Sequence, residues 1–451
     1  MAETHSGVVF FLGDRAYKLK KPVDLGFLDF RTREARRATC HREVELNRRL
    51  APDVYLGVSD VFNQSGELCD HLVVLRRMPE DRRLSALVVA GVEVGEQLDG
   101  LASLLAEFHR RADRSPAADR AAGAEALAAR WAANTAGLQP FVGGFVSSDA
   151  VSTVDAMAAR YLGGRRPLLA QRVADGRACD GHGDLLADDI FCFDDGPRVL
   201  DCLEFDDDLR LDDVLADVAF LAMDLERLGR PDLAGRFLAA YRDRSQDAWP
   251  SSLAHHHIAY RAQVRAEVSA IRADQGVAGS AQKAEQLLDL ARSHLEAAKV
   301  RLVLVGGLPG TGKSTLAAGV GDALGAVVLR SDVIRKELAG LAPDEPAAAA
   351  FGEGIYEASA TAATYRELLA RAEILLGLGS TVVLDASWSD EARRAEARRV
   401  AATTLSDVVE LRCVAPREIV DERIRRRAER GGDASDANAA IAVSWRQRRA
   451  A

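Results

Sequence analysis

The chain has 451 residues, of which 48% are hydrophobic and 28% are charged, and its formal net charge is −9 at pH 7. This length exceeds one ordinary globular core and fits two or three domains. The composition excludes wholesale disorder, a fibre and a membrane bundle. No apolar run approaches the length of a membrane helix and no leader is recognisable, so we expect a cytoplasmic protein.

The negative charge lies entirely in the first 300 residues. These hold 38 basic and 47 acidic side chains, whereas residues 301–451 hold 21 of each. Neither part has the positive excess of a domain that binds nucleic acid through its phosphates. We therefore expect small-molecule partners and no membrane, and nucleic acid is disfavoured as a partner.

Residues 1–79 are typical of a small lobe rich in strands, and residues 80–280 of a larger helical lobe. The pair Gly13-Asp14 separates two strand-like runs and indicates a hairpin. The expected elements are strands over 8–12, 15–21 and 71–78, a helix over 33–50, and a strand pair around the turn at 194–197.

Within the larger lobe, the sequence DGHGD ends at Asp184, Asp189 follows five residues later, and Asp201 comes after the next strand pair. This spacing is typical of a kinase catalytic loop, where the first acid positions the acceptor hydroxyl and the other two hold Mg²⁺. Lys18 on an early strand and Glu43 on the following helix are candidates for the ion pair that positions the α- and β-phosphates.

An amphipathic helix over 281–299 is the expected linker to a second domain over 300–451. Beyond it the pattern alternates between strands and helices, which predicts a three-layer α/β domain with a parallel sheet. The expected strands are 301–306, 326–330, 380–385 and 408–414, and the expected helices are 313–324, 353–377, 390–402 and 416–430.

The strongest motif lies between the first of these strands and the first helix, and it satisfies G-x-x-x-x-G-K-[ST]. The predicted nucleotide-binding residues are Gly307, Leu308, Pro309, Gly310, Thr311, Gly312, Lys313, Ser314 and Thr315. The backbone N–H groups and the helix N-terminus would surround phosphate oxygens. Lys313 would reach the β- and γ-phosphates and act in catalysis, and Ser314 would contact Mg²⁺.

Two carboxylates follow the next strands of this domain. Asp385 ends the strand-like run STVVLD and is a candidate metal ligand, and Asp332 is a candidate catalytic acid that orients an acceptor hydroxyl. The alternative is that both are helix caps or first-turn acids. Arg335 and Lys336, in the helix that follows Asp332, are candidate substrate-binding residues because cations there oppose the helix dipole.

Near the end of the chain, the run DERIRRRAERGG places Arg423 and Arg427 four residues apart on one helical face. They are candidate catalytic arginines on a lid that closes over the transferring phosphoryl group. A solvated helical face is the alternative. Because no N-K-x-D sequence indicates guanine, ATP is the expected nucleotide.

The strings GLPGTGKST, LRSDVIRKELAG, VVLDASW and ERIRRRAERGG resemble small-molecule P-loop kinases related to gluconate kinase and zeta toxins. FLGDRAYKLKK, DGHGD and VLDCLEF resemble the aminoglycoside phosphotransferase family, in the version fused to a P-loop kinase. The second resemblance implies a two-lobed α+β kinase fold, with Asp184 as base, Asp189 and Asp201 as metal ligands, and Lys18 paired with Glu43. Against this pattern, the few residues before Lys18 leave no room for the usual first strand and glycine-rich cover. The P-loop kinase resemblance has a departure of its own, because no final strand is visible after the lid-like segment.

The sequence therefore predicts an ATP- and Mg²⁺-dependent phosphotransferase that acts on a hydroxyl of a small polar metabolite or drug. A sugar, a sugar acid or an aminoglycoside would serve as acceptor, and the acidic excess of residues 1–300 suits a cationic one. The P-loop domain is the favoured active centre. Two alternatives stay open: a non-catalytic kinase-like module fused to a P-loop ATPase, and a polynucleotide 5′-hydroxyl kinase.

Overall fold

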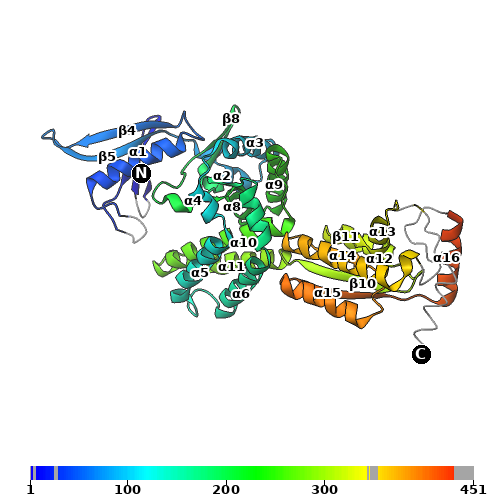
Figure 1. Cartoon of the computed structure of the whole chain (residues 1–451). Coiled ribbons are helices and arrows are strands. Elements are labelled where there is room, and N and C mark those ends of the chain that lie inside the picture. Colours follow the sequence, from blue (N-terminus) through cyan, green and yellow to red (C-terminus); the bar gives the residue numbers. More distant parts are fainter. Residues whose placement is uncertain (1, 4–6, 25–28, 343–344, 346–353, 431–451) are drawn as a thin grey trace. The chain divides into compact units, whose positions relative to one another are not determined.

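The computed structural model describes residues 2–3, 7–24, 29–342, 345 and 354–430 (Figure 1). The chain divides into two compact units. The first comprises Met1–Ala156, Leu169–Trp249 and Ala254–Leu295, and the second comprises Met157–Leu168, Pro250–Leu253 and Glu296–Ala451. The second unit thus gathers two short segments from the middle of the chain around its C-terminal part.

The first unit begins with a five-stranded antiparallel sheet. Its strands are β1 (Ala2–Glu3), β2 (Gly7–Leu12), β3 (Arg15–Lys20), β4 (Tyr55–Phe62) and β5 (Leu68–Arg76), in the order β1-β2-β3-β5-β4. The hairpin expected around Gly13 is confirmed by the pairing of β2 with β3. Two strands do precede Lys18 in the form of a β1–β2 hairpin, which corrects the expectation of a missing first strand. Residues 4–6, which join these two strands, are outside the described residues.

Strand β4 was not expected from the sequence. It lies at the edge of the sheet, most of its residues are partly or fully exposed, and its pairing with β5 shifts register near Gly57. An edge strand with little buried surface carries a weak alternation of apolar and polar residues, so the signal for it is poor.

Helix α1 (Arg33–Asn47) packs against this sheet. Its N-terminus is capped by Thr32, whose hydroxyl accepts a hydrogen bond from the Ala35 amide. Cys40 and Val44 face the sheet in a shared hydrophobic core. The helix ends at Asn47, three residues before the predicted end at residue 50.

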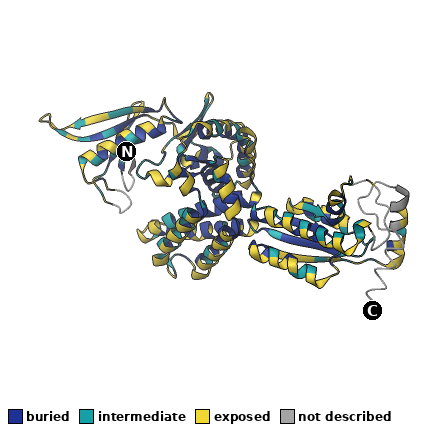
Figure 2. Ribbon diagram, viewed as in Figure 1, coloured by how far each residue is buried: buried dark blue, intermediate teal, exposed yellow. Residues whose placement is uncertain are grey.

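The rest of the first unit is mostly helical. Its helices are α2 (Leu84–Val89), α3 (Gly95–Arg111), α4 (Pro116–Ala121), α5 (Ala124–Leu138), α6 (Ser148–Gly164), α7 (Arg166–Ala174), α8 (Val214–Arg227), α9 (Pro231–Ser245), α10 (Ser251–Asp274) and α11 (Ser280–Ala297). Of these helices, residues 157–164 of α6, 166–168 of α7, 251–253 of α10 and 296–297 of α11 belong to the second unit. Two short antiparallel pairs hold the loop that carries Asp184: β6 (Ala178–Asp180) with β9 (Leu211–Asp213), and β7 (Ile190–Phe193) with β8 (Gly196–Val199). Helix α8 is buried from Val214 to Leu225 and forms the centre of this lobe (Figure 2).

The second unit contains a parallel sheet in the order β11-β12-β10-β13, as expected from the alternating pattern. Its elements are β10 (Arg301–Gly307), α12 (Lys313–Leu324), β11 (Val327–Arg330), α13 (Ser331–Leu338), α14 (Ala358–Gly377), β12 (Val382–Asp385), α15 (Glu391–Thr403), β13 (Asp407–Cys413) and α16 (Arg417–Arg430).

Side chains of β10 and β12 alternate between two cores. Leu302 and Leu304 pack with α14 and α15 on one face, and Val303 and Val305 pack with α12 on the other. These helices on both faces of the sheet confirm the three-layer α/β fold. The segment after α16, where a final strand was not expected, lies outside the described residues.

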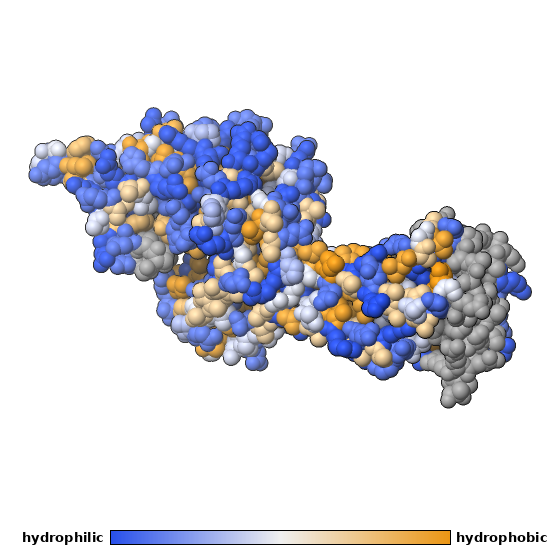
Figure 3. Space-filling view, in the orientation of Figure 1, coloured by the Kyte–Doolittle hydropathy of each residue, from blue (hydrophilic) through white to orange (hydrophobic). Residues whose placement is uncertain are grey.

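Hydrophobic side chains also reach the surface of the second unit, where Figure 3 shows several apolar patches. Leu324 and Ile374 are among the exposed ones. Among the described residues, none of the helices combines the length and hydropathy needed to cross a membrane.

Candidate functional site

In the first unit, β3 and α1 bring Lys18 and Glu43 together, and the loop after β8 adds Asp201. Lys18 Nζ lies 3.0 Å from a Glu43 carboxylate oxygen and 2.7 Å from Asp201 Oδ1. Burial opposes the charge of Lys18, but the two carboxylates outweigh it and raise the pKa of the lysine. The lysine charge in turn lowers the pKa of Asp201. Asp201 has a φ of 62°, an uncommon conformation for a non-glycine residue that is typical of functional sites.

A second lysine on β3 joins this cluster, and the sequence analysis missed it. Lys20 Nζ lies 2.6 Å from Glu43 Oε2 and also contacts Glu204. The Lys20 side chain is 1% exposed and that of Glu43 is fully buried. The periodicity of the strand could have predicted its place. Residues two apart on a strand point to the same face, so Lys20 shares the face of Lys18.

Asp184 stands on the loop between β6 and β7. Asp217 of α8 fixes this loop by accepting hydrogen bonds from the amides of His182 (2.8 Å) and Gly183 (2.9 Å), and it also pairs with His109 (3.0 Å). Partial desolvation raises the pKa of Asp184 to about 6. A carboxyl group with such a pKa changes protonation state near neutral pH and can accept a hydroxyl proton.

Asp189 lies near both Asp184 and Asp201. Desolvation and then the negative charges of Asp201 and Asp184 raise the pKa of Asp189 well above its ordinary value. Carboxylates that repel one another at a loop suit a hard divalent cation, because the cation offsets the repulsion and prefers oxygen ligands. The donor set therefore fits Mg²⁺, with Asp189 and Asp201 as the residues that would hold it.

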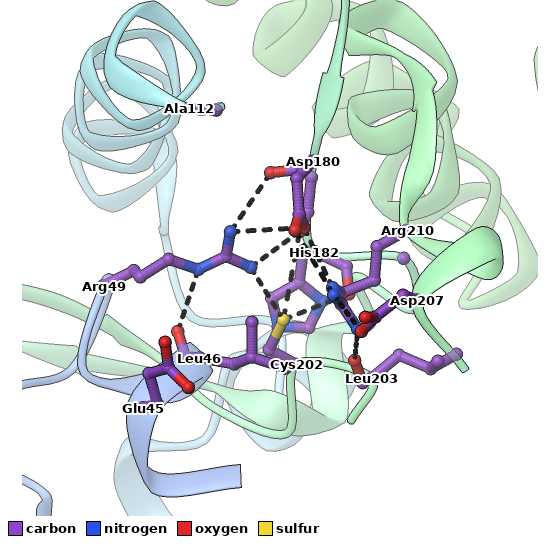
Figure 4. A network of polar contacts seen from close by, with 12 residues as sticks. Glu45, Leu46, Arg49, Ala112, Asp180, His182, Cys202, Leu203, Asp207 and Arg210 are labelled. Carbon is purple, nitrogen blue, oxygen red and sulfur yellow. Dashed lines mark hydrogen bonds and ion pairs between the residues drawn. The ribbon is translucent and has the colours of Figure 1, made fainter. Parts of the chain in front are cut away.

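Arg49, just beyond α1, ties the small lobe to this loop (Figure 4). Its guanidinium donates hydrogen bonds to the carbonyl oxygens of Asp180 (3.2 Å) and Gly181 (2.9 Å) and to Cys202 Sγ (3.2 Å). Arg210 holds Asp180 from the other side, with Nε 2.9 Å from Asp180 Oδ1. Arg49 thus fixes both the loop that carries Asp184 and the segment that carries Asp201. Neither Arg49 nor Arg210 belongs to a recognisable sequence motif.

In the second unit, the predicted phosphate-binding loop connects β10 to α12, which begins at Lys313. Gly307, Gly310 and Gly312 all have positive φ values. A Cβ atom at Gly307 would lie 2.6 Å from the Cys413 carbonyl oxygen, so this position requires glycine. Lys313 Nζ contacts the Leu308 carbonyl oxygen at 3.2 Å, which holds the lysine over the loop. Pro309 lies in the same loop.

Asp385, at the end of β12, lies beside the start of α12. Its carboxylate accepts a hydrogen bond from the Ser314 hydroxyl, and burial raises the pKa of Asp385 while the nearby Asp332 charge adds to this rise. The structure thus places Ser314 and Asp385, both predicted metal ligands, in contact. Thr315 is exposed in the first turn of α12.

The predicted substrate-binding cations of α13 are buried. Lys336 is 1% exposed, and Arg335 donates hydrogen bonds to the Ile355 carbonyl oxygen (2.9 Å) and Thr361 Oγ1 (3.0 Å). Their role toward a substrate stays a prediction.

On α16, Arg423 donates a hydrogen bond to the Thr311 carbonyl oxygen at 3.3 Å, so the predicted lid arginine reaches the phosphate-binding loop. The side chain of Arg427 lies outside the described residues. A cavity of about 670 Å³ adjoins the same loop and is lined in part by Gly307, Trp388 and Cys413.

Comparisons with known proteins agree with this division. The family described as the phosphotransferase enzyme family matches residues 9–255, and an AAA domain matches residues 302–451. The expected fusion of the two kinase-type domains is thereby confirmed. Uncharacterized proteins of Mycobacterium bovis and Mycobacterium tuberculosis are 47% identical over 450 residues, which is 99% of this chain and 89% of theirs.

Two solved structures are similar to part of the chain. A choline/ethanolamine kinase family protein of Mesorhizobium loti is 13% identical with a TM-score of 0.41, over 66% of this chain and 90% of that one. An aminoglycoside phosphotransferase in complex with GDP and kanamycin is 14% identical with a TM-score of 0.39, over 65% of this chain and 92% of that one. By the family match over residues 9–255 and by its mycobacterial relatives, the chain belongs to the phosphotransferase enzyme family.

Proposed function

We propose that the protein transfers the γ-phosphoryl group of ATP, in the presence of Mg²⁺, to a hydroxyl of a small polar molecule. The observation that carries this proposal is the contact of Lys18 with both Glu43 (3.0 Å) and Asp201 (2.7 Å). Kinase chemistry depends on placing a lysine ion pair and a metal-binding aspartate together beside a catalytic aspartate.

At the N-terminal centre, each residue has a separate task. Lys18 orients the α- and β-phosphates while Glu43 holds its ammonium group in place. Asp184 orients the acceptor hydroxyl and takes its proton as the oxygen attacks the γ-phosphorus. Asp189 and Asp201 would hold Mg²⁺, which neutralises phosphate charge when bound. The arrangement works mainly by position and electrostatics, since phosphoryl transfer needs little covalent help from the protein.

The P-loop domain is a second ATP centre in this proposal. Lys313 would contact the β- and γ-phosphates, and Ser314 and Asp385 would hold Mg²⁺. The cavity of about 670 Å³ beside the loop has room for a nucleotide base. The sequence favours this domain as the active centre. In it, Asp332 would orient the acceptor hydroxyl and Arg423 would contact the phosphates.

One experiment separates the two centres. The full chain, Lys313→Ala, Asp184→Asn and the double variant are incubated with radiolabelled ATP and a panel of sugars, sugar acids and aminoglycosides. We expect each single variant to lose transfer to a different acceptor, and the double variant to lose all of it. Lys299→Ala and Asp232→Asn, at surface ion pairs, are the controls.

The outcomes decide between the alternatives. Transfer that depends on Lys313 and not on Asp184 would leave the N-terminal domain as a binding module. ATP hydrolysis without any transfer would leave only the P-loop ATPase alternative. Transfer to oligonucleotide 5′-hydroxyls, included as a further arm, would favour the polynucleotide kinase.

A further inference from the structure

A cation from α10 faces the carboxylate of Asp184. Arg265 Nη1 lies 3.8 Å from Asp184 Oδ1, and the arginine side chain is 19% exposed. Among the described residues, this long ion pair is the one polar contact of the guanidinium group, which forms no hydrogen bond. Since a guanidinium carries five N–H donors, most of its binding capacity is directed at no protein group.

A second cation, Lys283 of α11, is within electrostatic reach of Arg265. Burial and then the positive charges of Arg227 and Arg265 lower the pKa of Lys283. Within the described part of the chain, the Lys283 ammonium has no ion pair with a carboxylate. A bound anion would offset the repulsion between these two partly desolvated cations.

Besides Asp184, which pairs with Arg265, a second acid acts on Lys283. Asp224 of α8 accepts hydrogen bonds from the Ala187 amide (3.0 Å) and from Arg227 Nε (2.6 Å). Its charge is therefore matched by Arg227. Asp184 offsets the charge of Arg265, so the positive patch of Arg265 and Lys283, counted together with Arg227, Asp184 and Asp224, carries one net positive charge, although residues 1–300 as a whole are acidic.

The patch belongs to the acceptor side of the centre. Arg265 acts on the pKa of Asp184, whereas the chief cationic influence on Asp189 comes from Arg83 and that on Asp201 from Lys18. Arg265 of α10 thus acts chiefly on Asp184, the carboxylate that would orient the acceptor hydroxyl. The two carboxylates that would hold the metal are influenced chiefly by other cations.

We propose that the alcohol phosphorylated at the N-terminal centre carries an anionic group, a carboxylate or a phosphate, that Arg265 and Lys283 bind. This inference rests on the proposed phosphotransferase function and narrows its substrate class. The acceptor oxygen forms a bond to the γ-phosphorus of ATP, the bond from that phosphorus to the ADP oxygen breaks, and the hydroxyl proton passes to Asp184. The products are the phosphorylated acid and ADP.

The test uses the full chain with Lys313→Ala, so that transfer reports the N-terminal centre. A protein-free bacterial small-molecule extract is separated on an anion exchanger into a retained anionic fraction and a flow-through of neutral and cationic compounds. Each fraction is incubated with the protein and radiolabelled ATP. We expect labelled product from the anionic fraction. Treatment of that fraction with phosphatase beforehand distinguishes the sources, because a phosphate-bearing acceptor is destroyed and a carboxylate-bearing acceptor survives.

Substitutions then test the patch itself. Arg265→Gln should raise the KM for the anionic acceptor by about 10- to 100-fold and leave the KM for ATP unchanged, as expected for loss of a charge-assisted hydrogen bond. Arg265→Lys should recover part of the loss. Arg292→Gln, at an exposed ion pair on α11, removes the same charge and should change neither value. ATP binding shows that each variant is folded.

Two results would overturn the inference. One is labelled product from the flow-through fraction. The other is a fall in kcat for Arg265→Gln with an unchanged acceptor KM, which would assign Arg265 to the transferring phosphoryl group. Absence of transfer to both fractions would instead overturn the proposed function of this centre, and the inference with it.

Discussion

Lys20→Met tests the buried charge cluster beneath the N-terminal centre. The substitution keeps a long apolar side chain and removes the ammonium that contacts both Glu43 and Glu204, whose side chains are 0% and 10% exposed. Removal of one partner from a buried ion pair costs about 3–5 kcal/mol, because the remaining charge stays desolvated. For a domain of this size the loss corresponds to a fall of roughly 6–20 °C in the melting temperature.

The stability lost in Lys20→Met should depend on pH. Burial and the Glu43 charge already raise the pKa of Glu204 in the folded chain, and loss of Lys20 would raise it further. A carboxyl group whose pKa is higher in the folded state favours folding when it is protonated. The difference in free energy of unfolding between wild type and Lys20→Met should therefore shrink as the pH falls from about 8 toward about 5.

The assay is thermal and urea unfolding of the full chain, followed by circular dichroism and by the fluorescence of Trp131 and Trp249 in the first unit. Arg37→Met, on the exposed side of α1, is the matched control. Lys20→Met with Glu204→Gln should recover part of the stability. A Lys20→Met chain as stable as the Arg37→Met control, or a deficit that grows as the pH falls, would refute the reasoning.

Three further predictions concern the two centres. Gly307→Ala should abolish ATP binding by the P-loop domain, measured by calorimetry in a Lys18→Ala chain that lacks the phosphate-orienting lysine of the N-terminal centre, because the new Cβ would meet a carbonyl oxygen at 2.6 Å; Gly319→Ala, with nothing within 4 Å, should bind ATP normally. At the N-terminal centre, kcat/KM should fall about tenfold per pH unit below about pH 6. The reason is that Asp184 must be ionised to accept the proton and its pKa is raised to about 6. A flat pH profile would exclude Asp184 as the base. Arg49→Gln should lower kcat there by about tenfold or more, because the loop would lose several hydrogen bonds to a charged group, with partial recovery in Arg49→Lys; an unchanged kcat would show that Arg49 does not position the loop.

The sequence alone determined the features that depend on local spacing. The alternation of strands and helices after residue 300 predicted the order of that domain, because each element buries its own apolar face. The phosphate-binding loop was identified because its glycines and Lys313 must be adjacent in the chain to surround a phosphate. The Lys18–Glu43 pair and the loop of Asp184 were likewise expected from motifs.

Only the tertiary structure decided which other charges meet at these sites. Lys18 and Asp201 are 183 positions apart, and no spacing rule relates Arg265 on α10 to Asp184 or Glu204 to Lys20. Such contacts follow from how whole helices and loops pack, so they leave no periodic signal in the chain. For this reason the overall acidity of residues 1–300 suggested a cationic acceptor, whereas the packing of α10 places Arg265 beside Asp184 of the catalytic loop.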